Sequence, residues 1–351
     1  MKDLSKILVI RLSSLGDILH TLPAFSDLRH SFPNATIDWV VERKCAYLLS
    51  TVKGIDTVHV FDKGSALPAS SDHNRPYPLW PMVRALRRQH YDLSIDFQGL
   101  LKTAFLGFMG GASRRIGFPA ELAREWPAHW FYSQTLIAPR ESLHVLELNR
   151  KLAAYAGARP FPFAYDPVVS KTDRDHVEFI LETNGLSEFV VVNPGGGWKS
   201  KNWKPEYYGA LTEKIRKELY LRVVVTTGPG EEILYEELVK HCREPLPLHL
   251  QVSFLQLIPL LQKSLLLIGG DTGPFHLACA LQTPVVGIFG PTSAVRNGPW
   301  NDQDETVTKQ MACSGCYKRD CPTDNACMDI PVDAVFEALR RRLEKIRKKP
   351  I

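Results

Sequence analysis

Residues 265–281 read LLLIGGDTGPFHLACAL and predict a strand, a tight loop and a helix in direct succession. The apolar run ends in two glycines, and Pro274 has the fixed φ that suits the first turn of a helix. Backbone N–H groups at such a helix start, with the Thr272 hydroxyl beside them and His276 about one turn later, suit a phosphate group. The alternative is a tight turn that is capped by Asp271 or Thr272.

The alternation of apolar runs and amphipathic stretches extends over most of the chain. Apolar runs that predict strands lie at 7–10, 35–41, 57–61, 92–97, 189–193, 221–227 and 284–289, and helical periodicity follows at 18–28 and 79–90. Strands that alternate with helices predict parallel sheets with covered faces. Ligands of such doubly wound sheets bind beyond the carboxyl ends of the strands. The loops after the strands are therefore the candidate sites.

The chain of 351 residues is long enough for two domains. The stretch 159–167 contains three prolines and no helical period, which indicates a linker. We expect one domain over 1–160, a second over 161–330, and a terminal segment over 331–351. Within that segment, Val332 to Lys348 predicts one amphipathic helix.

Charge is divided unevenly along the chain. Residues 1–165 carry 20 basic and 14 acidic side chains, 166–338 carry 16 and 23, and the last 13 carry seven basic residues and one acid. A basic first half and tail favour an anionic ligand or surface, although a solvated surface is an equal alternative. The net charge of +5 is too small to indicate nucleic-acid binding. No apolar run is long enough for a membrane helix or a signal peptide, so we expect a cytoplasmic protein.

Three further loops carry residues that could take part in chemistry. The loop 193–205 has three glycines and the lysines 199, 201 and 204, which could neutralise a diphosphate or be surface charges. The loop 227–232 places a carboxylate at a helix start, where it could bind a ribose or compensate the helix dipole. In the first half, Asp17 stands at a helix start and could be a general base or merely a cap. A G-x-x-x-x-G-K-[ST] motif and a strand-linked G-x-G-x-x-G motif are both missing from the sequence, which disfavours a P-loop kinase and a Rossmann dehydrogenase.

Four stretches together resemble glycosyltransferase family 9, the ADP-heptose:lipopolysaccharide heptosyltransferases. They are SSLGDILHTLPAFSDLR at 13–29, DFQGLLKTA at 96–104, GGDTGPFHLACAL at 269–281 and VVGIFGPT at 285–292. The resemblance implies the GT-B fold, in which two Rossmann-like doubly wound domains face each other across a cleft and no metal is required. By analogy with that fold, we expect the terminal helix at 332–348 to cross back to the first domain. It also implies inverting transfer of a heptose from ADP-heptose. WVVE at 39–42 and HTLPA at 20–24 favour members that add the first heptose to the Kdo of a Kdo-lipid A acceptor.

The resemblance also implies roles for individual residues. Asp17 matches the proposed base, and Lys102 and Arg124 fall on the acceptor side. The donor side comprises Lys201, with Lys199 as a competitor; Glu231, with Glu232 as a neighbouring alternative; and the turn of Asp271, Thr272, Gly273 and His276. The acceptor is an anionic glycolipid, so peripheral contact with the cytoplasmic face of the inner membrane is part of this expectation.

Four cysteines form a cluster, C-x2-C-x4-C-x5-C, made of Cys313, Cys316, Cys321 and Cys327. Four thiolates could hold a structural zinc, but the spacing differs from that of paired C-x2-C knuckles. A disulfide pair or free thiols are the alternatives.

Other functions remain open at this stage. The sugar could be a later heptose or a different sugar. The protein could also be a nucleotide-sugar epimerase on the same fold, or a sugar-nucleotide binder without activity.

Overall fold

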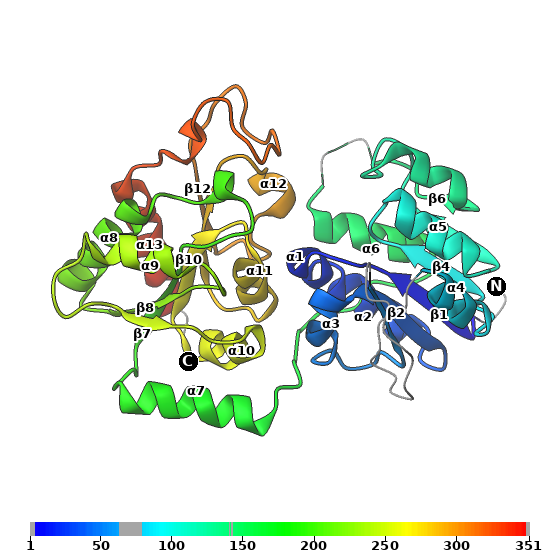
Figure 1. Ribbon diagram of the computed structural model, residues 1–351, viewed down its shortest axis with the longest axis horizontal. Helices are drawn as coiled ribbons and strands as arrows, with labels where there is room; N and C mark the ends of the chain where they lie inside the picture. The colour runs from blue at the N-terminus through cyan, green and yellow to red at the C-terminus, as the bar shows by residue number, and fades with distance from the viewer. Residues whose placement is uncertain (1–3, 63–78, 140, 142, 349–351) are drawn as a thin grey trace. The chain divides into compact units, whose positions relative to one another are not determined.

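A computed structural model describes residues 4–62, 79–139, 141 and 143–348. The chain divides into two compact units, Met1–Val168 and Val169–Ile351. The division falls at the end of the proline-containing stretch 159–167. Each unit is an α/β domain with its own parallel sheet (Figure 1).

The sheet of the first unit has the strand order β3-β2-β1-β4-β5-β6. Its strands are β1 (Lys6–Ile10), β2 (Thr36–Glu42), β3 (Val58–Phe61), β4 (Leu93–Asp96), β5 (Arg114–Gly117) and β6 (Gln134–Thr135). The helices are α1 (Leu15–Leu19), α2 (Leu22–Ser31), α3 (Arg43–Leu49), α4 (Leu79–Arg87), α5 (Leu101–Met109), η1 (Trp126–Phe131) and α6 (Val145–Tyr155). Central β1 pairs in parallel with β2 through Ile7 and Ile37, and with β4 through Ile7 and Leu93.

The sheet of the second unit has the order β12-β11-β10-β7-β8-β9. Its strands are β7 (Phe189–Asn193), β8 (Arg222–Thr226), β9 (Leu248–Leu250), β10 (Leu266–Gly270), β11 (Val285–Phe289) and β12 (Glu305–Thr308). The helices are α7 (Lys171–Thr183), η2 (Lys199–Lys201), α8 (Pro205–Lys214), η3 (Ile215–Leu219), α9 (Glu232–Val239), α10 (Phe254–Lys263), α11 (Gly273–Ala280), α12 (Ala294–Asn297), η4 (Ala326–Met328) and α13 (Val332–Arg347). All described strand pairs in both sheets are parallel, which confirms the predicted class of fold.

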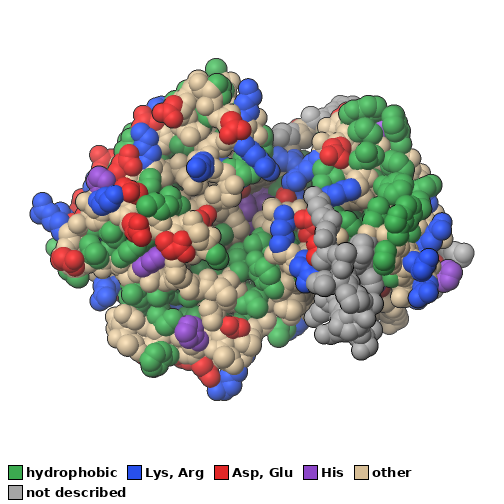
Figure 2. Space-filling view, in the orientation of Figure 1, with side chains coloured by type: hydrophobic (Ala, Val, Ile, Leu, Met, Phe, Trp, Pro, Cys, Tyr) green, Lys and Arg blue, Asp and Glu red, His purple; other side chains and the backbone are tan. Residues whose placement is uncertain are grey.

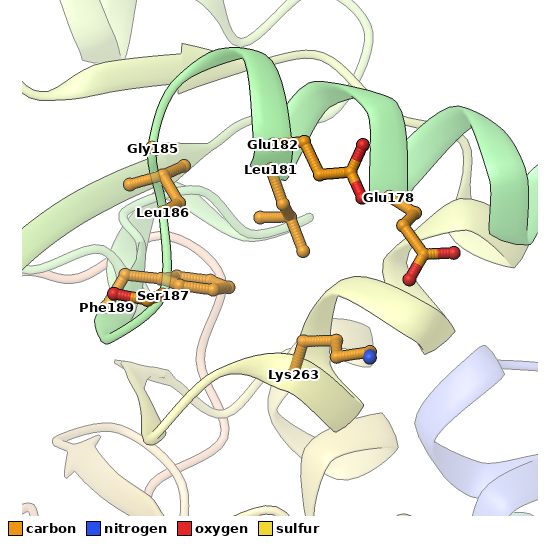
Figure 3. A pocket seen from close by; sticks show the side chains of 8 residues that line it. All are labelled: Glu178, Leu181, Glu182, Gly185, Leu186, Ser187, Phe189 and Lys263. Atoms are coloured by element: carbon orange, nitrogen blue, oxygen red, sulfur yellow. The ribbon is translucent and has the colours of Figure 1, made fainter.

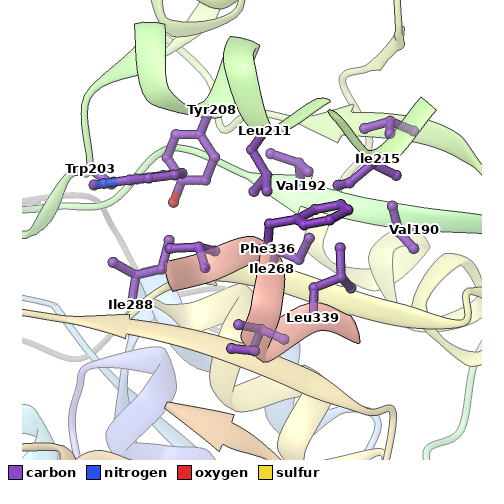
Figure 4. Packing of buried hydrophobic residues seen from close by; sticks show 14 of the residues in the cluster. Val190, Val192, Trp203, Tyr208, Leu211, Ile215, Ile268, Ile288, Phe336 and Leu339 are labelled. Carbon is purple, nitrogen blue, oxygen red and sulfur yellow. The ribbon is translucent and has the colours of Figure 1, made fainter. Parts of the chain in front are cut away.

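One apolar core of the second unit shows why its strands read as continuous hydrophobic runs. Val190 and Val192 of β7 and Ile268 of β10 lie under Trp203, Tyr208 and Phe336, all fully or almost fully buried (Figure 4). Strands of a parallel sheet are covered on both faces, so they lack the alternation of a half-exposed strand.

The C-terminal helix α13 belongs to this core. Val335, Leu339 and Leu343 are buried, and the helix packs against α8, β11 and β12 of the second unit. Its apolar face is therefore used within the second unit, and a crossing of this helix to the first domain stays a prediction. Arg342 on the helix also forms an ion pair with Asp304, with 2.7 Å between Nε and Oδ1.

Several basic residues of the C-terminal tail have partners inside the second unit. Arg341 and Lys345 both pair with Glu305, at 2.9 and 2.7 Å. Because Glu305 offsets part of the charge of these two residues, the expectation that the tail provides a free basic surface is weakened. None of the helices that the structure describes is long and apolar enough to span a membrane.

A shallow pocket of about 380 Å³ lies between α7 and the end of α10 in the second unit (Figure 3). Its lining comprises residues of α7, the loop before β7, the first residue of β7 and the end of α10: Glu178, Leu181, Glu182, Gly185, Leu186, Ser187, Phe189 and Lys263. The amino end of β7 is opposite to the edge where ligands of such sheets bind. None of the residues predicted to form a site lines this pocket.

Candidate functional site

Asp17 lies in the loop and short helix that follow β1, at the carboxyl edge of the first sheet. Its carboxylate accepts hydrogen bonds from the backbone N–H and the hydroxyl of Ser14, at 2.9 and 3.0 Å to Oδ2. It also forms ion pairs with Arg11, at 2.6 Å, and with Arg124, at 2.9 Å to Oδ1. The helix-cap interpretation is therefore correct for one oxygen but does not account for the two guanidinium groups.

The electrostatic environment keeps Asp17 ionised. Burial by itself opposes ionisation, but the charges of Arg11 and Arg124 and the Ser14 N–H outweigh it, so the pKa of Asp17 lies well below its ordinary value. The Asp17 side chain is 16% exposed to solvent. Asp17 is thus an ionised and partly accessible carboxylate at neutral pH.

The two arginines beside Asp17 differ in how firmly they are held. Arg11 is 3% exposed and also donates to the backbone oxygen of Phe97 in the loop after β4. Arg124 is 45% exposed on its side chain, and the described residues offer it no carboxylate partner except Asp17. Arg11 is therefore a fixed partner, and Arg124 is free to exchange Asp17 for another anion.

Lys102 lies at the start of α5, after β4. It pairs with Glu42, whereas Arg124 pairs with Asp17. The Lys102 ammonium is 2.6 Å from Glu42 Oε1 at the end of β2. Burial opposes ionisation of Glu42, yet Lys102 and Lys44 together hold its pKa below the ordinary value. The structure places Lys102 at the carboxyl edge of the same sheet, without direct contact with Asp17.

Sequence reasoning missed Arg11. Arg11 directly follows the apolar run of β1, so its charge was interpreted only as the end of the strand. Its position directly after a central parallel strand is the signal that could have identified it, because charged residues there point to the ligand edge.

In the second unit, Asp271 follows β10 and is the centre of a polar cluster. Its carboxylate is 2.9 Å from Lys201 Nζ and 2.7 Å from His276 Nε2, and it accepts a 3.2 Å bond from the Asn297 amide. Burial opposes ionisation, but His276 and Lys201 outweigh it, so the pKa of Asp271 lies far below its ordinary value. The predicted residues Lys201, Asp271 and His276 are brought together.

The structure distinguishes Lys201 from Lys199 as the lysine of the candidate site. Lys201 is mostly buried, and its ammonium also lies 4.5 Å from the Trp198 ring centroid. Lys199 is exposed. The local 3₁₀ turn η2 directs the two side chains differently, so Lys201 is the lysine that joins the Asp271 cluster.

The glycine loop after β7 lies against the loops after both neighbouring strands. Thr272 Oγ1 is 3.5 Å from Asn193 Oδ1, and the Asn193 amide donates to the Thr226 backbone oxygen at the end of β8. A Cβ on Gly196 would lie 2.9 Å from the Thr272 methyl, and a Cβ on Gly195 would overlap the Glu231 carboxylate. A larger residue at Gly195 would therefore require the Glu231 carboxylate to move away from the glycine loop.

Glu231 and Glu232 face different partners. Glu231 accepts a 2.9 Å hydrogen bond from the Gly228 N–H and lies against the glycine loop. Glu232 accepts from Gln251 at 2.9 Å and is exposed. The structure therefore brings Glu231, and not Glu232, to the loops of the candidate site.

Helix α11 begins at this cluster in the way the sequence predicts. Thr272 is its extended N-cap, with φ −137° and ψ 168°, and Gly273 and Pro274 form its first turn. Thr272 makes no side-chain capping bond, so its hydroxyl is not committed to the helix. The helix start with Lys201 beside it is a suitable site for an anionic group.

The four clustered cysteines are free thiols, of which Cys327 is buried and Cys313 and Cys316 are exposed. In the part of the chain that the structure describes, no group of three or more His, Cys, Asp or Glu side chains is arranged to hold a metal ion. The zinc interpretation therefore has no support from the geometry. The loop that carries the cysteines instead contacts the lysine loop, because Ser200 donates to the Lys318 oxygen at 3.0 Å and Arg319 lies 5.0 Å from the Trp198 ring centroid.

Two parallel α/β units with polar loops at the carboxyl edges are the architecture of a GT-B glycosyltransferase. Solved structures share it. The chain matches E. coli heptosyltransferase WaaC with ADP at a TM-score of 0.68 and 23% identity, over 97% of this chain and 98% of that one. E. coli ADP-heptose LPS heptosyltransferase II matches at a TM-score of 0.75 and 19% identity, over 97% and 99%.

Sequence comparisons identify the family. The family model described as glycosyltransferase family 9 (heptosyltransferase) matches residues 79–327. Lipopolysaccharide heptosyltransferase 1 of Pseudomonas aeruginosa is 27% identical over 325 residues, which are 90% of this chain and 87% of that protein. The chain belongs to glycosyltransferase family 9. It is a glycosyltransferase, and the epimerase and the inactive binder are not favoured.

Proposed function

We propose that this protein transfers a heptose, with inversion, from ADP-L-glycero-D-manno-heptose to the Kdo region of a Kdo-lipid A acceptor on the cytoplasmic side of the inner membrane. The observation that carries the proposal is the carboxylate of Asp17, which is ionised and accessible at the ligand edge of the first unit. A family 9 enzyme needs such a group to activate an acceptor hydroxyl.

The second unit binds the donor in this proposal. Lys201 and the first N–H groups of α11 face the phosphates, with the Thr272 hydroxyl and Gly273 in the same turn. Asp271 holds Lys201 in place through an ion pair and His276 through a hydrogen bond. Glu231, beside the glycine loop, accepts hydrogen bonds from the ribose hydroxyls.

The chemistry balances without a further reactant. The acceptor hydroxyl oxygen forms a bond to the anomeric carbon, the bond from that carbon to the phosphate oxygen breaks, and ADP leaves with the electron pair. Asp17 accepts the hydroxyl proton. Lys201 and the α11 start stabilise the charge that develops on ADP, and donors fixed in advance where charge develops supply a large catalytic effect.

Arg124 links acceptor binding to the basicity of Asp17. While Arg124 pairs with Asp17, the carboxylate is a weak base, because the arginine stabilises its ionised form. An anionic acceptor group that attracts Arg124 away from Asp17 raises the proton affinity of the base when substrate is present. Lys102, held by Glu42 at the same edge, offers the acceptor a second positive charge.

Mass spectrometry of the acceptor tests the proposal. Purified protein with ADP-heptose and Kdo-lipid A should add the mass of a single heptose, and NMR of the product should show the inverted anomeric configuration. An unchanged acceptor together with an isomerised sugar nucleotide would contradict transfer and identify an epimerase.

A further inference from the structure

Four large apolar side chains of the first unit are exposed on two neighbouring elements. Leu101 and Phe108 lie on α5, and Trp126 and Trp130 lie on η1; we call these four residues the aromatic face. Trp126 is 58% and Trp130 64% exposed. Hydrophobic side chains gather at the right of the space-filling view, over the region that Figure 1 labels α5 and β6 (Figure 2). Tryptophans are normally well buried, so two of them exposed together indicate a binding surface.

The face is held in place by ring contacts beneath and within it. Trp126 and Trp130 are packed edge to face, with 4.9 Å between ring centroids. Phe131 of η1 packs against Phe108 of α5 at 5.6 Å, so the two elements form one support. The tryptophans are therefore presented by a fixed scaffold, which lowers the entropic cost of binding.

Basic residues border this surface. Arg115 lies over the Phe108 ring, 5.4 Å from its centroid. Arg84, Arg87 and Arg88 of the neighbouring α4 segment are exposed and share a depression with Met109 of α5. Among the described residues, none of these four arginines forms an ion pair. Exposed tryptophans beside unpaired arginines are the combination that suits the interface of an anionic bilayer.

The aromatic face is joined directly to the Asp17 site. Arg124, which contacts Asp17, is two residues before Trp126. Glu125 between them fixes this segment to α5, because its carboxylate accepts the Leu101 N–H at 2.6 Å and its own N–H donates to the Gly99 oxygen at 3.0 Å. A bilayer that contacts Trp126 therefore lies beside the residues that would bind the head group of a lipid-anchored acceptor.

We propose that the aromatic face docks on an anionic lipid bilayer, with Trp126 and Trp130 inserted at the head-group level and Arg84, Arg87 and Arg88 over the lipid phosphates. The inference rests on the proposed function for its biological role, since it delivers a membrane-held acceptor to Asp17. The lipid binding itself can be measured without any transfer.

The test uses the full chain and vesicles of equal parts phosphatidylethanolamine and phosphatidylglycerol, compared with pure phosphatidylcholine. The wild type should co-sediment with the anionic vesicles, and brominated acyl chains should quench its tryptophan fluorescence. The double variant W126S/W130S should bind about tenfold or more weakly and lose most of the quenching. The matched control is Phe179→Ser, which removes a 65% exposed aromatic from α7 of the second unit and should bind as the wild type does.

Three outcomes would overturn the docking proposal. One is equal vesicle binding by W126S/W130S and the wild type. Another is a wild type that does not bind anionic vesicles at all. The third is a lipid-free wild-type dimer that W126S/W130S converts to monomer, as seen by light scattering, because the face would then join two copies.

Activity assays keep this test separate from the proposed function. With an acyl-free, water-soluble acceptor, W126S/W130S should retain the wild-type rate, whereas with acceptor in vesicles its rate should fall by about the loss in binding. Failure of all transfer, with vesicle binding intact and sensitive to the two tryptophans, would contradict the proposed function and leave the docking surface standing. Equal circular dichroism spectra and thermal midpoints confirm that the variants fold.

Discussion

The two units each place one ionised aspartate at the carboxyl edge of a parallel sheet, but the partners of the two carboxylates differ. Asp271 lies between Lys201 and His276, which are both largely buried. Asp17 lies between buried Arg11 and Arg124, whose side chain is 45% exposed. Both carboxylates have a lowered pKa, yet only Asp17 has a partner that can leave. A low pKa alone therefore does not distinguish a base from a positioning residue; the mobility of its counter-charge does.

The largest effect should come from Asp17→Asn. The amide keeps the size of the side chain but cannot accept the acceptor proton, so we expect turnover to fall by about 10²- to 10⁴-fold while ADP binds normally. Steady-state ADP release and calorimetry measure the two quantities. If Asp17 only capped α1, the variant would lose thermal stability and retain its rate, and Ser14→Ala, which removes the hydroxyl bond to Asp17, would behave alike.

Lys201→Ala should weaken ADP binding by the second unit. Removing the ammonium takes a charge from the diphosphate and leaves Asp271 less compensated beside it, so we expect ADP affinity to fall by about 10- to 100-fold. Lys199→Ala is the matched control, because Lys199 is exposed in the same loop and should bind ADP as the wild type does. A greater loss of ADP affinity in Lys199→Ala than in Lys201→Ala would show that Lys199, and not Lys201, contacts the diphosphate.

Gly195→Ala and Gly197→Ala test whether the loops must touch. A Cβ at Gly195 would overlap the Glu231 carboxylate, whereas a Cβ at Gly197 would meet nothing within 4 Å. We expect Gly195→Ala to weaken ADP binding about tenfold and Gly197→Ala to leave it almost unchanged. Equal affinities measured by calorimetry would show that Glu231 can move away without loss to the nucleotide.

The smallest effect should come from Arg124→Ala, which removes the exposed partner of Asp17. Asp17 must be ionised to act, and its lowered pKa keeps it active on the acid side of the pH–rate profile. Without Arg124 the pKa of Asp17 in the free enzyme should rise toward its ordinary value, so the acid limb of kcat/KM, which reports the free enzyme, should shift to higher pH. The profile of Lys102→Ala is the control, since Lys102 pairs with Glu42. An acid limb that stays in place in Arg124→Ala would separate Arg124 from the ionisation of Asp17.

The sequence predicted most of the central strands, because buried parallel strands are short unbroken apolar runs. It did not predict edge strands such as β6 and β12. β6 is two residues long, and β12 alternates between partly buried and exposed residues, so neither has an apolar run. The single helix expected over 18–28 is two helices, α1 and α2, with a break at His20 and Thr21.

The candidate site followed from the same principle only in part. The resemblance placed Lys201, Asp271 and His276 together on the donor side, and the structure brings them together because β7 and β10 are neighbours in the sheet. The choice of Lys201 over Lys199 needed the turn of η2, which spacing does not reveal. The aromatic face was not visible in WPAHWF, because a short 3₁₀ segment has no apolar period that separates exposed from buried rings.

ADP release from ADP-heptose, with and without Kdo-lipid A, tests the central claim most directly. We expect ADP release only when donor and acceptor are both present, and we expect Asp17→Asn to lose this release while it still binds ADP. Release at the same rate without acceptor, or full release by Asp17→Asn, would contradict it.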